Sequence, residues 1–402
     1  MMDPSPSTPT IAAALGARTS DRKLLDLDHT RQFVHGIFHE QLHAKRVLSL
    51  ANGVAGVLQA AVLSVHAIGQ AYAALAEITP KSAVKQIDRM LSNSALSLDV
   101  TLAQWARFVV GDHPSIVVAL DWTDFEVDDH TTLCAFMVTT HGRAMPLCWK
   151  TVQKSELKDR RTAIELEMIE RLHGYLPEEV CVTLLADRGF GYQELYELLA
   201  GLGWDYVIRF RGSILVEAMD GTVLPAQEWV PPNGRTKMLV GARVTAKRAE
   251  VGAVVTVKAK GMKEPWCLAT SLAEAKATEI VTLYGRRFTI EEGFRDTKDL
   301  HFGMGLSATH IGDANRRDRL LLLVAMAQAL LTLLGAASEE SGLDRYLKVN
   351  TVKRRTHSLY RQGLYWFSAL PTMREDWLRR LIEAFDRLVR ENRFFSFVFG
   401  LK

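Results

Sequence analysis

Two apolar runs, each followed directly by an aspartate, constrain the fold of this 402-residue chain more than any other feature. The first run, SIVVAL at residues 115–120, is rich in β-branched residues and precedes Asp121. The second, VCVTLLA at residues 180–186, precedes Asp187. Continuous runs of this kind are typical of buried strands in α/β proteins. Ligand sites in such sheets lie beyond the carboxyl ends of the strands, although either aspartate could equally be a turn residue or a helix cap.

The segments around these two runs complete an α/β pattern. Alternation and helical periodicity predict further strands and helices: strands at residues 131–140, 143–151 and 204–210, and helices at residues 160–173 and 192–202. Residues 212–271 change to a period of two, which predicts short antiparallel strands and therefore a β-rich insertion. The α/β pattern then resumes with a helix that we expect to begin near Ala273.

The region before the first buried strand is predicted to be helical, with a break at Asn52-Gly53. Thr79 followed by Pro80 has the pattern of a helix N-cap and first helical position. The helix that follows carries three basic residues at a spacing that could enter a DNA groove: Lys81, Lys85 and Arg89. A helix, a short turn and a basic helix form the helix-turn-helix outline. Many small helical bundles have the same outline, so DNA binding by this helix remains one of two interpretations.

A second informative stretch is YGRRFTIEEGFRDTK, in which four residues have the spacing Tyr-x2-Arg-x3-Glu-x6-Lys. On an α-helix, with about 100° per residue, Tyr284, Arg287, Glu291 and Lys298 would share a stripe narrower than about 90°. Arg295 would extend the same stripe. Mixed charges on a helix face are most often a solvated surface with i,i+4 ion pairs. The spacing, together with the two upstream aspartates, favours a functional face instead.

Asp121, Asp187 and Glu291 are three hard oxygen ligands of the kind that Mg²⁺ prefers. Two such ions about 3.5–4 Å apart can activate a nucleophile on one side of a phosphodiester and stabilise the leaving oxygen on the other. Arg287 could then grip a phosphate with its planar fork and Lys298 with its point charge. A role for Tyr284 as nucleophile is a rival that we disfavour, because the carboxylates already supply a metal-based route.

The order Asp, Asp, Glu, with Tyr284, Arg287 and Lys298 around the glutamate, resembles the DDE transposases of the YREK-signature insertion sequences, the IS-four type. DRGF around Asp187 supports the resemblance, and DWT at Asp121 fits it more loosely. The resemblance implies an RNase H-like catalytic core, a mixed sheet with helices, interrupted by a β-rich insertion. It also implies that Asp121, Asp187 and Glu291 bind two Mg²⁺ ions, for which Mn²⁺ could substitute.

The same resemblance implies contacts with DNA. Tyr284, Arg287 and Lys298 would bind phosphates of the transposon ends, and Trp266 matches the position of a tryptophan that stacks near a flipped base. A core tryptophan is the alternative for Trp266, and a solvated arginine is the alternative for Arg295. The implied partners are double-stranded DNA, as terminal inverted repeats and as target, and a second copy of the chain in a synaptic homodimer.

The charge distribution and the cysteines bound the remaining possibilities. Net charge is only +3, but residues 351–402 hold 11 Lys/Arg and 5 Asp/Glu, a surplus of six that suits either a phosphate-facing surface or a soluble helical tail. The four cysteines show no CxxC pair, which argues against zinc and against a disulfide framework. We therefore expect a cytoplasmic, nucleoid-associated protein.

Leu320–Ala337 is apolar enough to span a membrane, but a buried core helix is the preferred interpretation.

These observations predict six segments and one function. The segments are a disordered tail (1–25), a helical DNA-binding region (26–112), the first part of the core (113–211), the β-rich insertion (212–272), the second part of the core (273–337) and a helical basic region (338–402). The predicted function is metal-dependent cut-and-paste transposition by end binding, cleavage and strand transfer. The alternatives are an inactive relative that binds transposon ends, and an RNase H-like nuclease that does not transpose.

Overall fold

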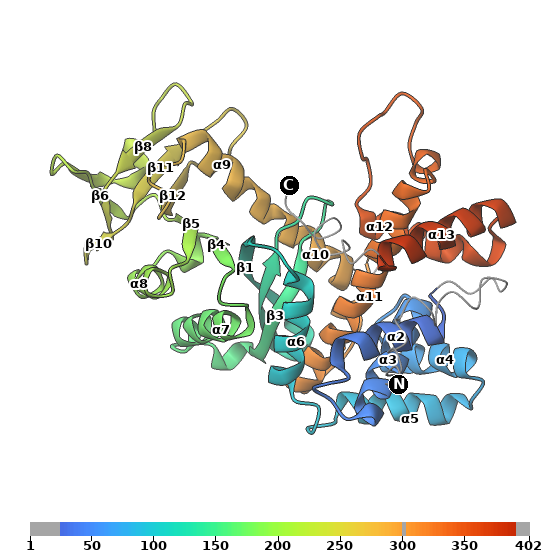
Figure 1. The fold of residues 1–402 in the computed structure, drawn as a ribbon. Helices are drawn as coiled ribbons and strands as arrows, with labels where there is room; N and C mark the ends of the chain where they lie inside the picture. Colours follow the sequence, from blue (N-terminus) through green and yellow to red (C-terminus); the bar gives the residue numbers. More distant parts are fainter. Residues whose placement is uncertain (1–24, 300–302, 391–402) are drawn as a thin grey trace, which may run out of the picture.

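The predicted strands assemble into one mixed sheet of eight strands in the computed structural model, which describes residues 25–299 and 303–390 (Figure 1). The order across this sheet is β3-β2-β1-β4-β5-β12-β11-β8. Its strands are β1 (Ser115–Phe125), β2 (His130–Met137), β3 (Met145–Gln153), β4 (Cys181–Ala186), β5 (Asp205–Phe210), β8 (Lys237–Val240), β11 (Ala253–Val257) and β12 (Trp266–Thr270). β4 pairs in parallel with β1 and β5, and the other pairings are antiparallel. The predicted tail lies outside the described residues, apart from Leu25.

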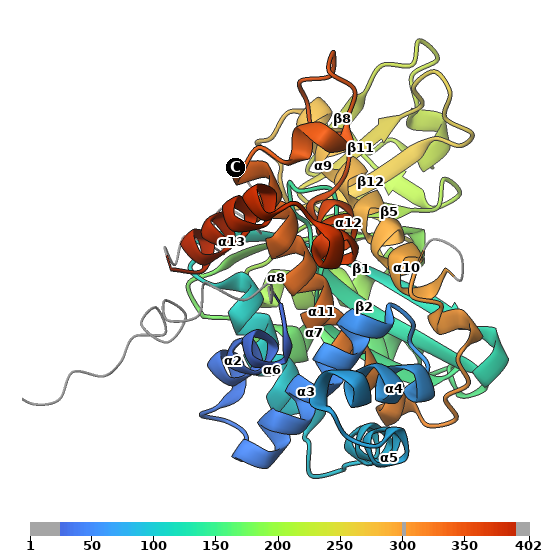
Figure 2. The same ribbon diagram turned by 90° about the vertical axis from the view of Figure 1, so that its right-hand side faces the viewer.

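Helices cover both faces of the sheet. α7 (Arg161–Tyr175) and α8 (Gln193–Gly201) lie on one face, and α10 (Thr289–Lys298) and α11 (Ala314–Glu340) lie on the other (Figures 1 and 2). The apolar faces of these helices and both faces of the central strands form a continuous core. The fold class predicted from the sequence, a mixed α/β sheet with flanking helices as in RNase H-like cores, is therefore confirmed.

The N-terminal region is helical, as predicted, but its break lies elsewhere. Its helices are α2 (Leu27–Phe38), α3 (Ala44–Ala60), α4 (Val65–Ala76), α5 (Pro80–Leu91) and α6 (Leu98–Val110). α3 runs through Asn52-Gly53, so the predicted break there is wrong. Asn52 donates a hydrogen bond to the Tyr72 hydroxyl at 2.8 Å, and a Cβ at Gly53 would lie 2.9 Å from Leu323 of α11. Tertiary packing therefore uses these two residues, and the turn falls after Ala60 instead.

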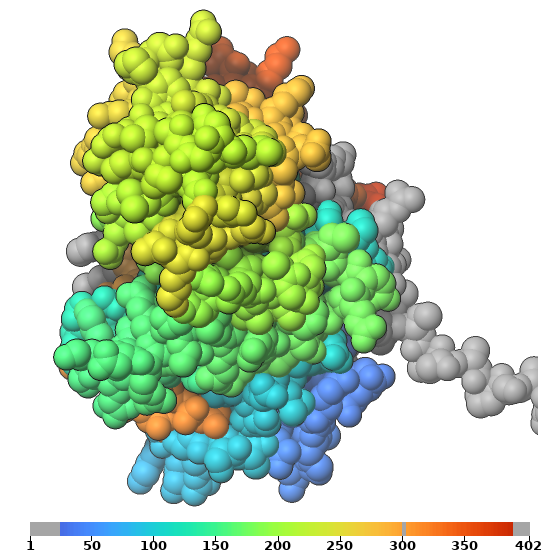
Figure 3. Space-filling model, turned by 90° about the vertical axis from the view of Figure 1, so that its left-hand side faces the viewer, coloured from blue at the N-terminus to red at the C-terminus, as the bar shows by residue number. Residues whose placement is uncertain are grey.

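The β-rich insertion is divided between two sheets. β8, β11 and β12 extend the main sheet beyond β5. A second sheet of four short strands contains β6 (Leu215–Glu217), β7 (Val223–Pro225), β9 (Arg243–Val244) and β10 (Ala249–Glu250). The insertion is thus continuous with the α/β sheet, because β12 pairs directly with β5. In Figure 3 the insertion forms one end of the molecule and the N-terminal helices form the opposite end.

The apolar helix α11 is the central support of the fold. By length and composition it could cross a membrane. However, 89% of its most apolar 18-residue stretch is buried within the structure, as in the core helix of a soluble protein. It packs against the N-terminal helices, β3 and the C-terminal helices α12 (Leu359–Ala369) and α13 (Glu375–Arg390). α12 crosses it closely, since a Cβ at Gly363 would lie 1.7 Å from the Leu331 carbonyl oxygen. The C-terminal region is therefore integral to the core.

One buried carboxyl group fastens α11 to β3. Asp318 accepts hydrogen bonds from the Thr151 amide at 3.1 Å and from the Thr151 hydroxyl, and its own carbonyl oxygen accepts the Trp149 indole N–H at 3.1 Å. Burial raises the pKa of Asp318 to about 7, although the two Thr151 bonds and Arg317 oppose this shift. The folded protein thus holds a proton near neutral pH that the unfolded chain has released.

This proton predicts a pH-dependent stability. Between about pH 4 and pH 7 the folded state binds more protons at Asp318 than the unfolded state does, so the free energy of unfolding falls as pH rises, by up to about 1.4 kcal/mol per pH unit. Asp318→Asn should remove this part of the slope, because an amide keeps the Thr151 contacts but does not titrate in this range. Urea unfolding at pH 5, 6 and 7 measures the effect. Parallel slopes for parent and variant would contradict the prediction.

Candidate active site

Asp121 and Asp187 lie side by side because of strand register. β1 and β4 pair in parallel, and Leu120 opposite Ala186 is the last aligned pair. Each aspartate is the next residue along its chain segment, Asp121 within β1 and Asp187 directly after β4, so the two carboxylates emerge at the same edge of this pairing. The prediction that the first strand ends at Leu120 is wrong, since β1 continues to Phe125 while paired with β2. Only its pairing with β4 stops at Leu120.

The surroundings of Asp121 have opposing effects on the pKa of its carboxyl group. Burial raises its pKa above the ordinary value. Arg287 opposes this rise as a nearby positive charge, Asp187 adds to it as a nearby negative charge, and the hydrogen bond from the Trp122 amide at 2.9 Å lowers it. Asp187 accepts the Gly189 amide at 2.8 Å, which orients its carboxylate at the start of the turn η3 (Arg188–Phe190). The two like charges therefore interact with each other and with one shared cation.

That cation is the guanidinium of Arg287, which bridges two of the three predicted ligands. Its Nη1 lies 2.8 Å from Asp121 Oδ2, and its Nη2 lies 3.3 Å from Glu291 Oε1. The Arg287 side chain is 7% exposed, whereas that of Glu291 is 55% exposed. Glu291 is thus joined to the sheet edge through Arg287 and faces solvent on its other side.

The segment that carries Glu291 is divided into three parts by a 3₁₀ turn, whereas the sequence predicts one helix. α9 (Ala277–Gly285) begins four residues later than expected, the 3₁₀ turn η5 (Arg286–Phe288) follows, and α10 completes the segment. Gly285 has no neighbour within 4 Å of where a Cβ would lie, so its effect is its low helix propensity at the junction of α9 and η5. The backbone angles at the junctions remain in the right-handed helical region, which keeps Arg287 and Glu291 on one side.

A buried ionic cluster fixes the opposite face of α10. Asp296, 2% exposed, accepts Arg361 Nη2 of α12 at 2.9 Å and also pairs with Arg143 Nε from the turn between β2 and β3. Gly293 packs closely, since a Cβ there would lie 3.3 Å from the Phe136 ring. Removing either partner of such a buried pair leaves an uncompensated charge. The helix of Glu291 is therefore positioned by the sheet and by the C-terminal region together.

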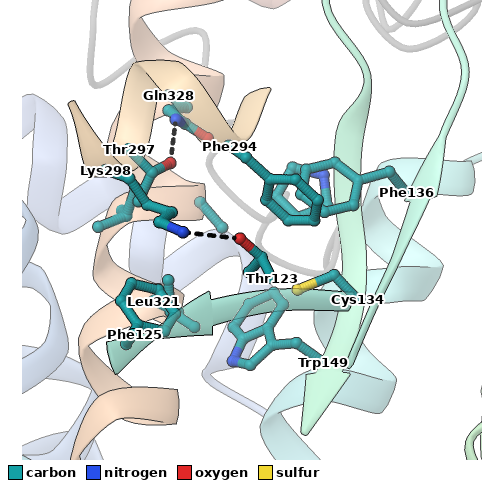
Figure 4. Close-up of a pocket in the computed structure, with 13 residues that line it drawn as sticks. Thr123, Phe125, Cys134, Phe136, Trp149, Phe294, Thr297, Lys298, Leu321 and Gln328 are labelled. Carbon is teal, nitrogen blue, oxygen red and sulfur yellow. Dashed lines mark hydrogen bonds between the residues drawn. The ribbon is translucent and has the colours of Figure 1, made fainter. Parts of the chain in front are cut away.

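Lys298 points into the protein beneath α10. Its Nζ donates to the Thr123 hydroxyl at 3.1 Å (Figure 4) and also to the Asp124 carbonyl oxygen at 2.6 Å. It borders a small cavity of about 30 Å³ and lies 4.9 Å from the centre of the Phe125 ring. Burial lowers the pKa of Lys298, an effect that the Asp124 carboxylate opposes. Lys298 thus ties α10 to the end of β1 in this structure.

The aromatic residues near Arg287 form a single group. Tyr284 is buried and meets the Trp266 ring edge to face at 4.9 Å between centroids. Trp266 also lies 5.9 Å from Phe288, with the rings near parallel, and Phe288 is 40% exposed. The Arg287 guanidinium lies 4.9 Å from the Phe288 centroid. The tryptophan and tyrosine proposed for DNA contacts are therefore packed against each other beside the site.

The other predicted DNA contacts lie at the surface. Arg295 is exposed and pairs with Glu292 of the same helix, as in the solvated alternative. Lys81, Lys85 and Arg89 are exposed along α5, which begins at Pro80 with the Thr79 hydroxyl accepting the Ser82 amide, as predicted. α4 crosses α5 closely, because a Cβ at Gly69 would lie 2.5 Å from the Val84 Cα. The three basic side chains of α5 are therefore exposed, while another part of the same helix packs against α4.

Glu165 of α7 is a residue that our sequence analysis missed. Only 1% exposed, it accepts the Trp122 indole N–H at 2.7 Å, Arg161 Nε at 2.9 Å and the Tyr192 hydroxyl at 2.8 Å. Trp122 follows Asp121, and Tyr192 follows the turn that begins at Asp187. The carboxylate of Glu165 therefore links the two aspartate-bearing segments. The sequence did contain a signal for this role. In RTAIELEMIERL, Glu165 has the helical spacing of the apolar residues that face the core, and a charged residue at such a position is seldom buried without a partner.

The three carboxylates supply suitable chemistry for a divalent metal, but they are not gathered around one point. Within residues 25–299 and 303–390, no three His, Cys, Asp or Glu side chains are arranged to hold a metal ion together. Arg287 lies between Asp121 and Glu291, so its positive charge stands where the carboxylates face each other. Hard oxygen donors that repel each other fit Mg²⁺, since a cation relieves their repulsion.

Comparison with known proteins adds a family. Residues 112–329 match the family model described as the Transposase DDE domain. The match covers more than half of the chain, from just before β1 into α11, and includes Asp121, Asp187 and Glu291. A search of curated proteins gave no match.

The contacts of Glu165 predict a large loss of stability on its removal. Glu165→Ala leaves the Trp122 indole and the Tyr192 hydroxyl without their acceptor, which should lower the free energy of unfolding by about 2–4 kcal/mol. Glu165→Gln retains one acceptor oxygen and should lose less than half as much. Urea unfolding measures both. Glu167→Gln, on the exposed side of the same helix, is the control, and equal losses for Glu165→Ala and this control would refute the prediction.

Proposed function

The chain belongs to the DDE transposase family, and from this premise we propose that it catalyses metal-dependent cut-and-paste transposition of an insertion sequence. In this proposal it binds terminal inverted repeats, cleaves the DNA at the transposon ends and joins the ends to target DNA. The observation that carries the proposal is the register of β1 and β4, which aligns Asp121 and Asp187 within the matched segment, with Glu291 joined to Asp121 through Arg287.

DDE transposases generally use divalent metals, and we assign Asp121, Asp187 and Glu291 as the ligands of two Mg²⁺ ions, for which Mn²⁺ would substitute. When bound, such ions supply Lewis-acid stabilisation of the attacking and leaving oxygens of a phosphodiester. The contribution of the chain is to keep the carboxylates charged and oriented. The positive charge of Arg287 favours the ionised form of Asp121, and a backbone amide fixes one oxygen of each aspartate.

We further assign the chain to the YREK-signature type, with Tyr284, Arg287 and Lys298 as phosphate contacts. In the structure these groups bind protein partners, and Arg287 and Lys298 are both held within reach of the end of β1. Phosphate oxygens would replace the Asp121 oxygen as the partner of Arg287. Trp266 would stack on a base, a role for which its position beside the exposed Phe288 is the supporting observation.

End recognition is assigned to the N-terminal helices, residues 26–112, through Lys81, Lys85 and Arg89 on the exposed face of α5. The catalytic core would comprise residues 113–211 and 273–337, with the insertion at residues 212–272. The active form would be a homodimer that pairs two transposon ends in the cytoplasm, in association with the nucleoid. Arg295 is assigned only a peripheral contact, because it already pairs with Glu292.

The experiment uses the full chain and a supercoiled plasmid that carries its gene with the flanking DNA. With Mg²⁺, the parent should cleave at the flanks and join the ends to a second plasmid. Asp121→Asn, Asp187→Asn and Glu291→Gln should each reduce cleavage by more than about 100-fold, because each removes a negatively charged ligand. Glu292→Gln, adjacent in sequence but turned toward Arg295 and Arg143, is the control and should cleave normally.

The same assay separates the alternatives. Binding to the flanking DNA without cleavage by the parent would indicate a DNA-binding relative, and cleavage without joining would indicate a nuclease that does not transpose. Full activity in any of the three carboxylate variants would overturn the catalytic assignment.

A further inference from the structure

The chain between α12 and the turn η7 (Asp344–Leu347) forms a long, basic loop, residues 348–357, which we call the basic loop. Its sequence, KVNTVKRRTH, contains four Lys/Arg and no Asp/Glu. It rises from the body of the molecule above α12 (Figure 1). Val349 is 67% exposed, and Lys353, Arg354 and Arg355 are exposed as well. Such a concentration of one charge sign on a projecting loop requires an explanation.

Both ends of the basic loop are fixed to the protein. Near its C-terminal end, Arg355 grips Glu339 of α11 with two nitrogens, each 2.6 Å from a carboxylate oxygen, and donates to the Thr140 carbonyl oxygen at 3.3 Å. Beyond it, the Leu359 amide donates to the His141 carbonyl oxygen at 3.3 Å. At the start of the loop, Lys348 pairs with Asp344 at 2.7 Å. The C-terminal side of the loop is therefore anchored to α11 and to the turn between β2 and β3, and its N-terminal side is joined to the preceding turn η7.

Lys353 and Arg354 differ from their neighbours. Lys348 and Arg355 each have a carboxylate partner, whereas Lys353 and Arg354 have no ion-pair or hydrogen-bond partner among the residues described by the structure. With no acid in the loop to neutralise them, two adjacent positive charges are held outward into solvent. Unpaired Lys and Arg side chains gathered on one element are the electrostatic pattern of a surface that binds nucleic acid phosphates.

The base of the basic loop belongs to the framework that holds the helix of Glu291. Arg361, a few residues after the loop, pairs with Asp296 of α10, and Arg143 from the turn that contacts the loop pairs with the same carboxylate. In Figures 1 and 2 the loop rises toward the same end of the molecule as α9 and the insertion. The loop and the insertion stand on either side of α10 in Figure 1. A duplex that reaches Glu291 from this end would pass the loop.

We propose that Lys353 and Arg354 bind the phosphate backbone of duplex DNA beside the active site, without reading its sequence. The proposal rests on the proposed function and assigns to the C-terminal region a role in DNA binding. Each phosphate contact by Lys or Arg releases condensed counterions, so it adds about 0.9 to the slope of log affinity against log salt concentration. Two such contacts therefore have a measurable signature that is independent of cleavage.

The test compares the full chain with the double variant Lys353→Gln/Arg354→Gln, using a fluorescein-labelled 60-base-pair duplex of arbitrary sequence. Binding is measured by fluorescence anisotropy between 50 and 200 mM NaCl. The variant should bind about 10- to 100-fold more weakly at 100 mM salt, and the magnitude of its salt slope should fall by about 1.8. Both side chains are exposed, so thermal unfolding of the variant should match that of the parent.

The control is Arg374→Gln/Arg379→Gln, which removes the same charge from the residue that precedes α13 and from its first turns, also in the C-terminal region. It should retain the affinity and the slope of the parent. If the parent binds the duplex and the loop variant retains the same affinity and slope, the inference about the loop is wrong while the proposed function stands. If the parent itself does not bind the duplex at any salt concentration, the proposed function fails and this inference fails with it.

Discussion

The pairing of β1 with β4 is the constraint on which the rest of the site depends. Parallel register places two aspartates at the same edge of the sheet, where burial and the nearby charge of Asp187 disfavour the ionised form of Asp121. A positive charge must offset this cost, and in the structure Arg287 provides it while also holding Glu291. Arg287 therefore bridges two of the three carboxylates, and Asp187 lies beside Asp121 at the same sheet edge. If a phosphate became the partner of Arg287, the carboxylates would lose their positive partner. A divalent metal ion bound by the carboxylates would then replace that positive charge.

The remainder of the fold keeps Glu291 facing that sheet edge. The helix that carries Glu291 is held in place through the buried Asp296. This carboxylate forms ion pairs with Arg143 from the core and with Arg361 from the C-terminal region. α11 supports this region from below and packs against the N-terminal helices as well. A change in the packing of the C-terminal region would therefore shift the helix that carries Glu291. The basic loop is attached to α11 and lies next to Arg361, which pairs with Asp296. DNA bound at the loop would therefore be held in a fixed position relative to the helix of Glu291.

Much of this could be predicted from the sequence where one residue type dictates one local outcome. The β-branched runs before Asp121 and Asp187 predicted their strands, and Thr79 predicted the start of its helix. Predictions failed where tertiary contacts outweigh local preference, as at Asn52-Gly53 in the middle of α3, where Asn52 bonds to Tyr72 and Gly53 packs against α11. The role of Glu165 was missed because two of its three donors, Trp122 and Tyr192, come from segments that are distant in the sequence. The bridging position of Arg287 is likewise visible only in three dimensions.

The central claim is that Asp121, Asp187 and Glu291 form one divalent-metal site, and metal binding tests it most directly. Titration of the full chain with Mn²⁺, followed by the electron paramagnetic resonance signal of the free ion, gives the affinity without any DNA. The account predicts saturable binding that Asp121→Asn, Asp187→Asn and Glu291→Gln each weaken by at least about tenfold, whereas Glu167→Gln has no effect. Undiminished Mn²⁺ binding in these three variants would contradict the account.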